Sequence, residues 1–211
     1  LAILDVSDPD LPVLRGHHAP PTGERYYRGS VAGTHVYCGA REAGLVVVDA
    51  TAVAEPVEVA RVAPAGTSYE GSTVADGVLY ACRHAAGLHI LDVTDPSVPA
   101  TLATFTDLQN AWDVVVADRT AYVADGLGGL AILDVSQPGA PQLLARVATE
   151  GAATDVAVAG SLAAVALGSA GVALHDVADP ASPDLLAAYD TPGLAMTLDL
   201  AGDRLFVADW D

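Results

Sequence analysis

The chain of 211 residues carries 27 acidic residues against nine arginines and no lysine, which gives a formal net charge of −18 at pH 7. This negative charge argues against nucleic acid as a partner, because phosphates need a basic surface. Apolar residues make up 52% of the chain, enough for the core of one compact domain, and no apolar run is long enough for a membrane span.

One motif occurs five times along the chain. Its apolar run is typical of a strand covered on both faces, and it ends at an aspartate whose carboxylate is expected to accept a backbone N–H two residues later and start a turn. Because every repeat carries this aspartate, we interpret it as structural. The copies are residues 1–12 (LAILDVSDPDLP), 44–56 (GLVVVDATAVAEP), 87–99 (GLHILDVTDPSVP), 129–141 (GLAILDVSQPGAP) and 171–183 (GVALHDVADPASP), with the aspartates Asp5, Asp49, Asp92, Asp134 and Asp176.

The spacing of these aspartates, 42 to 44 residues, predicts propeller blades of four short strands. Residues 1–16 supply the third and fourth strands of a blade, and residues 194–211 supply a first and a second strand. The expected fold is therefore an all-β, five-bladed propeller in a single domain, closed where these two half-blades pair, which would leave no free sheet edge. The full blades are expected at about residues 26–62, 69–105, 111–147 and 153–189.

The runs LAILD, LVVVD, LHILD and VALHD, with the turn that follows each, resemble the LVIVD-repeat family over the whole chain. The resemblance implies a β-propeller of the kind common in secreted or surface-associated proteins, with no single activity. An extracellular or cell-surface location is expected on this ground, and a cytoplasmic one stays open. Function has to be argued from the site.

Alternating strand direction places the connections between blades on the same face as the turns from second to third strands. We call this the crossover face. Here the repeats have diverged into charged and aromatic residues, whereas the opposite face repeats the same turns. A pocket of convergent polar groups with aromatic walls near the axis is the expected site. The predicted ligand-binding residues are Arg28, Arg41, Arg83, Trp112, Asp113, Asp155 and Trp210.

Scarce arginines gather on this face, and guanidinium groups bind carboxylates or phosphates in a bidentate way. A small anionic or polar organic ligand is therefore expected. The alternative is that these arginines form salt bridges with acidic residues of the rim, namely Glu24, Glu42, Glu70, Asp113 or Asp155. If the site is catalytic, the groups whose protons could be used are Tyr27, Tyr69, Glu70 and His84. His89 and His175 lie within third strands and are interpreted as satisfied interior residues.

Clustered carboxylates at one end of the channel make Ca²⁺ a weak alternative, and no other cofactor is expected. The residues concerned are Asp113, Asp155, Asp125 and Asp209. Three function classes fit the sequence. The first is a non-catalytic propeller that binds a small molecule or a protein surface. The second is a lyase, isomerase or hydrolase that uses the same pocket, and the third is a piece of a larger surface repeat protein, indicated by ends that fall within a repeat.

Overall fold

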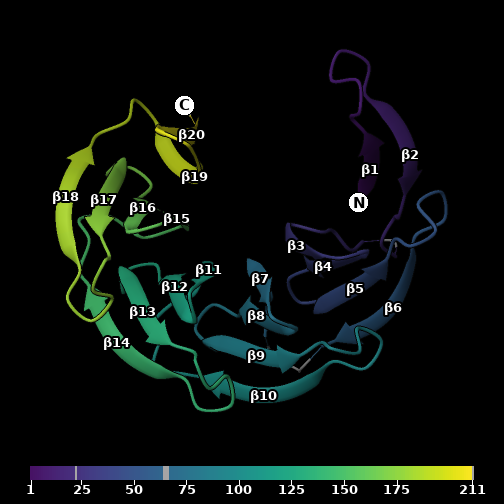
Figure 1. Cartoon of the computed structure of the whole chain (residues 1–211), viewed down its shortest axis with the longest axis horizontal. Helices are drawn as coiled ribbons and strands as arrows, with labels where there is room; N and C mark the ends of the chain where they lie inside the picture. Colours follow the sequence, from purple (N-terminus) through teal and green to yellow (C-terminus); the bar gives the residue numbers. More distant parts are fainter. Residues whose placement is uncertain (22, 64–66, 211) are drawn as a thin grey trace.

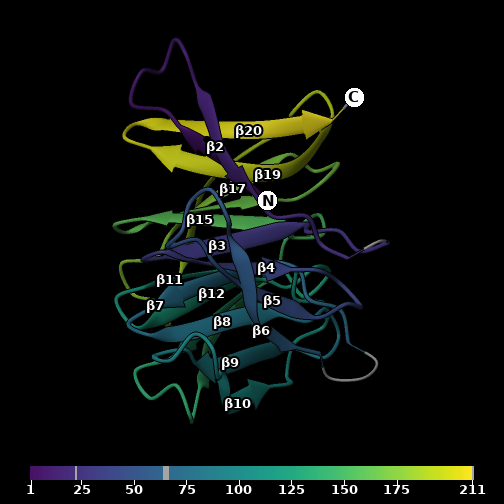
Figure 2. The ribbon, with the colours of Figure 1, turned by 90° about the vertical axis from the view of Figure 1, so that its right-hand side faces the viewer.

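A computed structural model of the chain describes residues 1–21, 23–63 and 67–210. The expected all-β class is confirmed, because the elements of this described part are twenty β-strands. No helix in the part described is long and apolar enough to cross a membrane. The strands are arranged as an arc of sheets around a common axis (Figure 1). Figure 2 shows β15, β19 and β20 running through the thickness of this arc.

Four antiparallel sheets of four strands form the full blades, each ordered from the inner to the outer strand. Blade 1 contains β3 (Arg28–Ala32), β4 (His35–Gly39), β5 (Leu45–Asp49) and β6 (Val57–Val62), and blade 2 contains β7 (Ser72–Ala75), β8 (Val78–Cys82), β9 (Leu88–Asp92) and β10 (Ala100–Phe105). Blade 3 contains β11 (Asp113–Ala117), β12 (Thr120–Ala124), β13 (Leu130–Asp134) and β14 (Gln142–Val147), and blade 4 contains β15 (Asp155–Ala159), β16 (Leu162–Ala166), β17 (Val172–Asp176) and β18 (Asp184–Tyr189). The half-blades are β1 (Ala2–Asp5) with β2 (Val13–His17), and β19 (Leu194–Ala201) with β20 (Arg204–Trp210).

The hydrophobic core lies in layers between neighbouring blades. Tyr80 and Ile90 of blade 2, for example, belong to one buried cluster with Val123 and Leu133 of blade 3. The second and third strands of each full blade are therefore covered on both sides, which explains why their sequences are apolar at consecutive positions.

The repeated aspartate starts a turn as expected. In all five copies its Oδ1 accepts the backbone N–H of the residue two positions later, at 2.7 to 3.0 Å. This bond lowers the pKa of Asp92 and Asp134. A register shift interrupts the pairing of the third and fourth strands in every blade, for example between Ile132 and Leu133. The motif thus encodes a strand, a turn and a bulge together.

The expected closure into a five-bladed ring is wrong for this structure. In the described residues β1 pairs only with β2, and β20 pairs only with β19. Figure 1 shows the two half-blades on either side of a gap in the arc. The repeat count gives the number of blades in the chain, but the packing layer between neighbouring blades sets the angle between them. As they pack in this structure, the blades do not complete a turn.

The half-blade β1–β2 nevertheless has the geometry of an outer blade half. Its register shift, between Ile3 and Leu4, falls at the same motif position as the shift in blade 3. Val6 is 62% exposed, whereas the corresponding Val135 is 2% exposed and donates its backbone N–H to the first hairpin turn of its own blade. Val6 therefore lacks the inner strands that would cover it.

Candidate functional site

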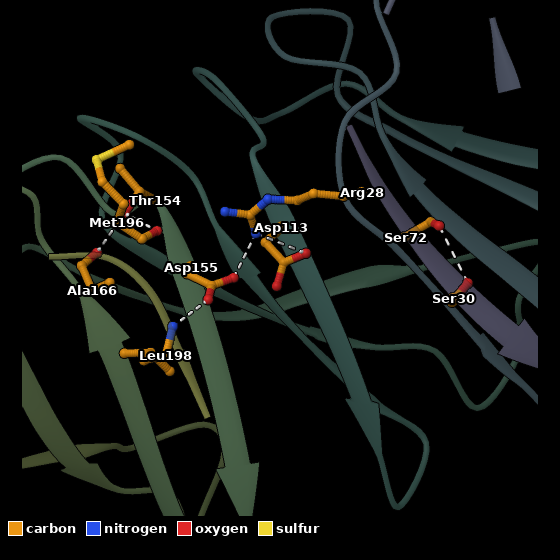
Figure 3. A network of polar contacts seen from close by, with 9 residues as sticks. All are labelled: Arg28, Ser30, Ser72, Asp113, Thr154, Asp155, Ala166, Met196 and Leu198. Carbon is orange, nitrogen blue, oxygen red and sulfur yellow. Dashed lines mark hydrogen bonds and ion pairs between the residues drawn. The ribbon is translucent and has the colours of Figure 1, made fainter. Parts of the chain in front are cut away.

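Arg28 crosses the axis of the arc from blade 1 (Figure 3). Its Nη1 lies 2.6 Å from Oδ1 of Asp155 and 3.5 Å from Oδ1 of Asp113, so one guanidinium bridges the inner strands of blades 3 and 4. Asp155 also accepts the backbone N–H of Leu198 in β19 at 2.7 Å. Gly71 occupies the corresponding position in blade 2, where a Cβ atom would collide with the Asp113 carboxylate. Arg28, Asp113 and Asp155 border an open depression of about 330 Å³ at the axis.

The charges at the axis do not balance, because one arginine faces two carboxylates. Burial, together with the neighbouring charge of Asp155, raises the pKa of Asp113 well above its usual range. Burial alone would lower the pKa of Arg28, but the two carboxylates outweigh that effect and raise it. Arg28 is therefore paired with acidic side chains of the protein itself. This is the alternative to ligand binding that the sequence left open.

Corresponding turns on the crossover face connect each blade to the next. Arg41 and His84 occupy the same position as Gly126 and Gly168, and each forms an isolated bridge with the entry to the following blade. All four have positive φ values between 49° and 59°. Glycine adopts this conformation readily, whereas for Arg and His it costs about 1 to 3 kcal/mol. Blades 1 and 2 thus carry a side chain at this strained backbone position, whereas blades 3 and 4 carry glycine.

The side chains of Arg41 and His84 meet at one buried carboxylate. Glu70 is 4% exposed, and its Oε1 lies 2.9 Å from Nε of Arg41 and 3.1 Å from Nε2 of His84. Nδ1 of His84 is 3.1 Å from Oδ1 of Asn110, and its ring meets Trp112 edge to face at 4.6 Å between centroids. We call Arg41, Glu70 and His84 the Glu70 cluster.

The outer side of the Glu70 cluster is open to solvent. Arg41 retains 43% exposure of its side chain, and its guanidinium carbon lies 3.9 Å from the centre of the Tyr27 ring. Tyr27 itself is 44% exposed. Among the described residues the side chain of Arg41 donates hydrogen bonds through Nε alone, so its two terminal nitrogens have no hydrogen-bond partner there. Together the two side chains present a fixed cation beside an aromatic ring.

The remaining arginine and tyrosine predicted for the site have other partners. Tyr69 is 1% exposed, and its hydroxyl lies 2.7 Å from Nδ1 of His89, so its ring is a core group. Arg83 lies 5.9 Å from the centre of that ring and donates weakly to Ala86 and Thr104. Burial, helped by the charge of Arg83, lowers the pKa of His89 to about 4. Neither Tyr69 nor Arg83 reaches the Tyr27 and Arg41 surface.

Three other predicted residues are also separate from the Glu70 cluster. Trp210 is 63% exposed at the end of β20, beside the gap in the arc. Asp125 is fully buried and forms an ion pair of 2.6 Å with Arg146. Asp209 accepts hydrogen bonds from Thr191 and Gly193.

The four aspartates considered for Ca²⁺ do not form one cluster. Within residues 1–21, 23–63 and 67–210, no group of three or more His, Cys, Asp or Glu side chains is placed to hold a metal ion. A cation at Asp113 and Asp155 would have to displace the guanidinium of Arg28, which already neutralises part of their charge.

Two further hollows lie on the opposite face, between blades 2 and 3 and between blades 3 and 4. Their volumes are about 560 and 310 Å³, and corresponding residues line them, such as Tyr80 and Tyr122 or Val135 and Val177. Because the repeat itself produces these hollows, their presence alone assigns no specific site.

Comparison with protein families gives a match over most of the chain. The model of the LVIVD repeat matches residues 30–63, 74–107, 109–149 and 150–191. The chain belongs to the LVIVD-repeat family. The matched stretches correspond closely to the four full blades of this LVIVD-repeat protein. A comparison with curated protein sequences finds no match.

Solved structures similar to this LVIVD-repeat chain include a β-propeller domain. The β-propeller domain of Cps50 (Swd1) from Myceliophteria thermophila has a TM-score of 0.69 at 14% identity, with 83% of this chain and 62% of that chain covered. The computationally designed Ika8 protein has a TM-score of 0.68 at 11% identity over 93% and 59%, and a chain of the Mitotic Checkpoint Complex has 0.72 at 12% over 86% and 59%. These likenesses establish the β-propeller fold, and this chain spans about 60% of each of these structures.

Sequence reasoning placed the Glu70 cluster on the correct face but did not identify the arrangement of its members. The signal was present in the repeat alignment, since Arg41 and His84 stand where blades 3 and 4 have glycine. A non-glycine residue at such a position costs backbone strain energy. Its presence therefore indicates that the side chain has a role.

Proposed function

We propose that this LVIVD-repeat protein is a non-catalytic binding propeller that holds a polar, carboxylate-bearing partner on its crossover face. The observation that carries the proposal is the convergence of Arg41 and His84, both in strained backbone conformations, on the buried Glu70. A buried acceptor that fixes a half-exposed arginine prepares the outer nitrogens of that arginine to receive a carboxylate.

Tyr27 and Arg41 are the contact residues in this proposal. The ring of Tyr27 supports one side of the guanidinium and offers an aromatic surface to a planar ligand. Arg28 does not serve as the anion contact, because it is already paired with Asp113 and Asp155. The partner is either a small organic acid or an acidic side chain on a protein surface.

Binding is favoured over catalysis by the state of the groups that would transfer protons. Tyr69 and Glu70 are both buried, and each is already bonded to another side chain of the protein. Both ring nitrogens of His84 are engaged as well, with Glu70 and Asn110. These contacts hold the cluster in place and leave its outer surface for recognition.

The test is a thermal shift experiment with benzoate, phosphate, benzamide and Ca²⁺ in parallel. Benzoate at 100 times its dissociation constant should add about 2.7 kcal/mol of stability, and uncharged benzamide should add little. Arg41→Met should abolish the response, whereas the matched control Arg204→Met, on an exposed hairpin of the opposite face, should keep it. No response to benzoate, or an equal response in Arg41→Met, would overturn the proposal.

A second proposal concerns the ring itself: the free edges of β1 and β20 are filled by strands of further repeats, so that the chain functions as part of a larger propeller. The open arc and the partial coverage of Ika8 and Cps50 support this proposal. A direct sequence observation also supports it, because the run LAILDVS at residues 1–7 is identical to residues 130–136, whose strand β13 pairs with β12 in blade 3.

A pair of engineered cysteines tests the larger ring. By analogy with the pairing of Ala131 with Val123, Ala2 of β1 should face the position of Val207 in a β20-type strand. The variant Ala2→Cys/Val207→Cys should therefore cross-link between copies and give a ladder on a non-reducing gel. The natural cysteines Cys38 and Cys82 are buried and should not interfere. A cross-link confined to the monomer would show closure into five blades and refute the proposal.

A further inference from the structure

The hairpin turn between the first two strands of blade 3 carries an arginine in a strained backbone conformation. It connects β11 to β12 through Asp118 and Arg119, whose φ values are 48° and 62°. Blade 2 has the same kind of turn with Asp76 and Gly77, at 50° and 76°. A two-residue turn with positive φ at both residues favours glycine at the second. The opposite face therefore does not repeat the same turns throughout, because Arg119 stands where this turn favours glycine.

The side chain of Arg119 is not needed to hold the turn. The backbone carbonyl of Arg119 accepts the N–H of Val135 at 2.9 Å, and Gly77 accepts the N–H of Val93 in blade 2 at the same distance. Arg119 is exposed, and its guanidinium forms no ion pair within the part of the chain that the structure describes. A strained arginine that contributes only a backbone bond to the scaffold points to recognition by its side chain.

Arg119 lines the hollow of about 560 Å³ between blades 2 and 3. The repeat accounts for the walls of this hollow but not for the arginine. In the corresponding hollow of about 310 Å³ between blades 3 and 4, Ser161 takes the place of Arg119, and its carbonyl accepts the equivalent bond from Val177. The aspartate on the preceding blade is common to both hollows, as Asp76 in the first and Asp118 in the second. The cationic group is thus specific to the hollow between blades 2 and 3.

Opposite charges belong to the two sides of this hollow. Burial, with the charge of Asp76, raises the pKa of Tyr80, which places the Asp76 carboxylate near the Tyr80 ring on the side of blade 2. Hydrogen bonding from Ser136 lowers the pKa of Asp134, and the charge of Arg119 contributes, which places the guanidinium near the Ser136 turn of blade 3. The hollow therefore offers a carboxylate from one blade and a guanidinium with a hydroxyl group from the next.

The floor between these groups is apolar. Val78 and Val116 are partly buried, and Val135 is 2% exposed. A simple anion in the hollow would meet the charges of Asp76 and Asp118, and a simple cation would meet the charge of Arg119. A ligand that carries one charge of each sign and an apolar group avoids both conflicts and covers the valine floor.

We propose that the hollow between blades 2 and 3 binds a free amino acid with an apolar side chain. The carboxylate of the amino acid pairs with Arg119 and accepts a hydrogen bond from the Ser136 hydroxyl, its ammonium group pairs with Asp76, and its side chain lies on the valine floor. The site lies on the face opposite the Glu70 cluster and shares no residue with it, so either proposal can fail without the other.

Isothermal titration with three probes tests the need for both charges. L-phenylalanine carries both, phenylalaninamide lacks the carboxylate, and N-acetylphenylalanine lacks the ammonium group. The dissociation constant of each derivative should be higher than that of L-phenylalanine by about tenfold or more, because each derivative loses one charge-assisted contact. The two derivatives also resemble the two ends of a peptide. Equal affinity for either of them would overturn the proposal of a free amino acid.

Two variants locate the binding in this hollow. Arg119→Gly gives blade 3 the Asp-Gly turn of blade 2, so it should keep or raise the melting temperature, and it should weaken binding of L-phenylalanine by about tenfold or more. Asp76→Asn should weaken binding to a similar extent and keep the turn, because asparagine adopts positive φ readily. The matched controls Arg204→Met and Asp203→Asn, on the exposed hairpin of β19 and β20 at the same face, should leave binding unchanged.

Three results would overturn the proposal. The first is that L-phenylalanine does not bind the unmodified protein. The second is that Arg119→Gly or Asp76→Asn binds it as tightly as before. The third is that Arg119→Gly lowers the melting temperature, since the arginine would then be kept for stability.

Discussion

Replacing Arg28 with methionine should destabilise the protein strongly, because no other charge compensates the axial carboxylates. The guanidinium lies 2.6 Å from Asp155 and 3.5 Å from Asp113, and the three side chains are only 25%, 8% and 15% exposed. Removing one partner of a largely buried ion pair costs about 3 to 5 kcal/mol. Arg28→Met should therefore lower the free energy of unfolding by about 3 kcal/mol at pH 7.

The loss should depend on pH in a defined direction. The pKa of Asp113 is raised by burial and by Asp155, so its favourable contribution is present in acid and is lost as the pH rises through the raised value. Protonation of Asp113 removes one of the two charges that the substitution leaves unpaired. The effect of Arg28→Met should therefore be larger at high pH and should shrink as the pH is lowered.

Urea unfolding over a series of pH values, followed by the fluorescence of Trp112 and Trp210, measures this effect. The double variant Arg28→Met/Asp155→Asn is the control, because it removes an acid together with the base while Asn can still accept the Leu198 N–H. It should recover a large part of the lost stability. A loss below about 0.5 kcal/mol at pH 7, or a loss that does not change with pH, would refute the reasoning.

Three other predictions follow from single contacts. Asp134→Ala should lower the urea midpoint, because it removes the acceptor 2.8 Å from the Ser136 N–H; since that bond lowers the pKa of Asp134, the difference from the unmodified protein should shrink in acid, and a constant difference would count against it. Burial, with the charge of Arg83, lowers the pKa of His89 to about 4, so stability should fall as the pH drops from about 6.5 towards 4, and His89→Leu should lose this part of the pH dependence in acid titrations followed by circular dichroism. Burial raises the pKa of Cys38 to about 11, so a thiol reagent at pH 8 should label it only after urea is added; fast labelling of the native protein would contradict its burial.

Much of the fold could be predicted from the sequence because the repeat states it several times. The apolar run and the aspartate at Asp134 predict a covered strand and the turn that ends it, and the structure shows both. Closure could not be predicted in the same way. It depends on the angle between blades, which comes from side chains such as Tyr80 and Leu133 packing across a layer, and no single repeat contains that information.

The candidate site, too, could be predicted from the sequence only in part. Divergence among repeats located Arg41, Glu70 and His84 on one face, because a residue that differs between blades is visible in one sequence. The acidic partner of each arginine could not be predicted from the sequence. Arg28 reaches from residue 28 to Asp155 across the axis, and a contact of that span depends on the whole arc. The expectation of hydrogen-bond partners for His175 was wrong, because neither of its buried ring nitrogens has one within the described part of the chain.

At the bridges between blades, backbone groups hold the blades together, and the side chains are available for recognition. Arg41 and Tyr69 join their blades through backbone groups alone, each N–H donating to the carbonyl of the other, and Gly126 does the same with Ala153. The side chain at such a position can therefore change without removing a bond of the scaffold. Blades 3 and 4 have glycine at this position. A recognition residue could be introduced there by evolution or by design with the architecture unchanged, and its cost would be local backbone strain.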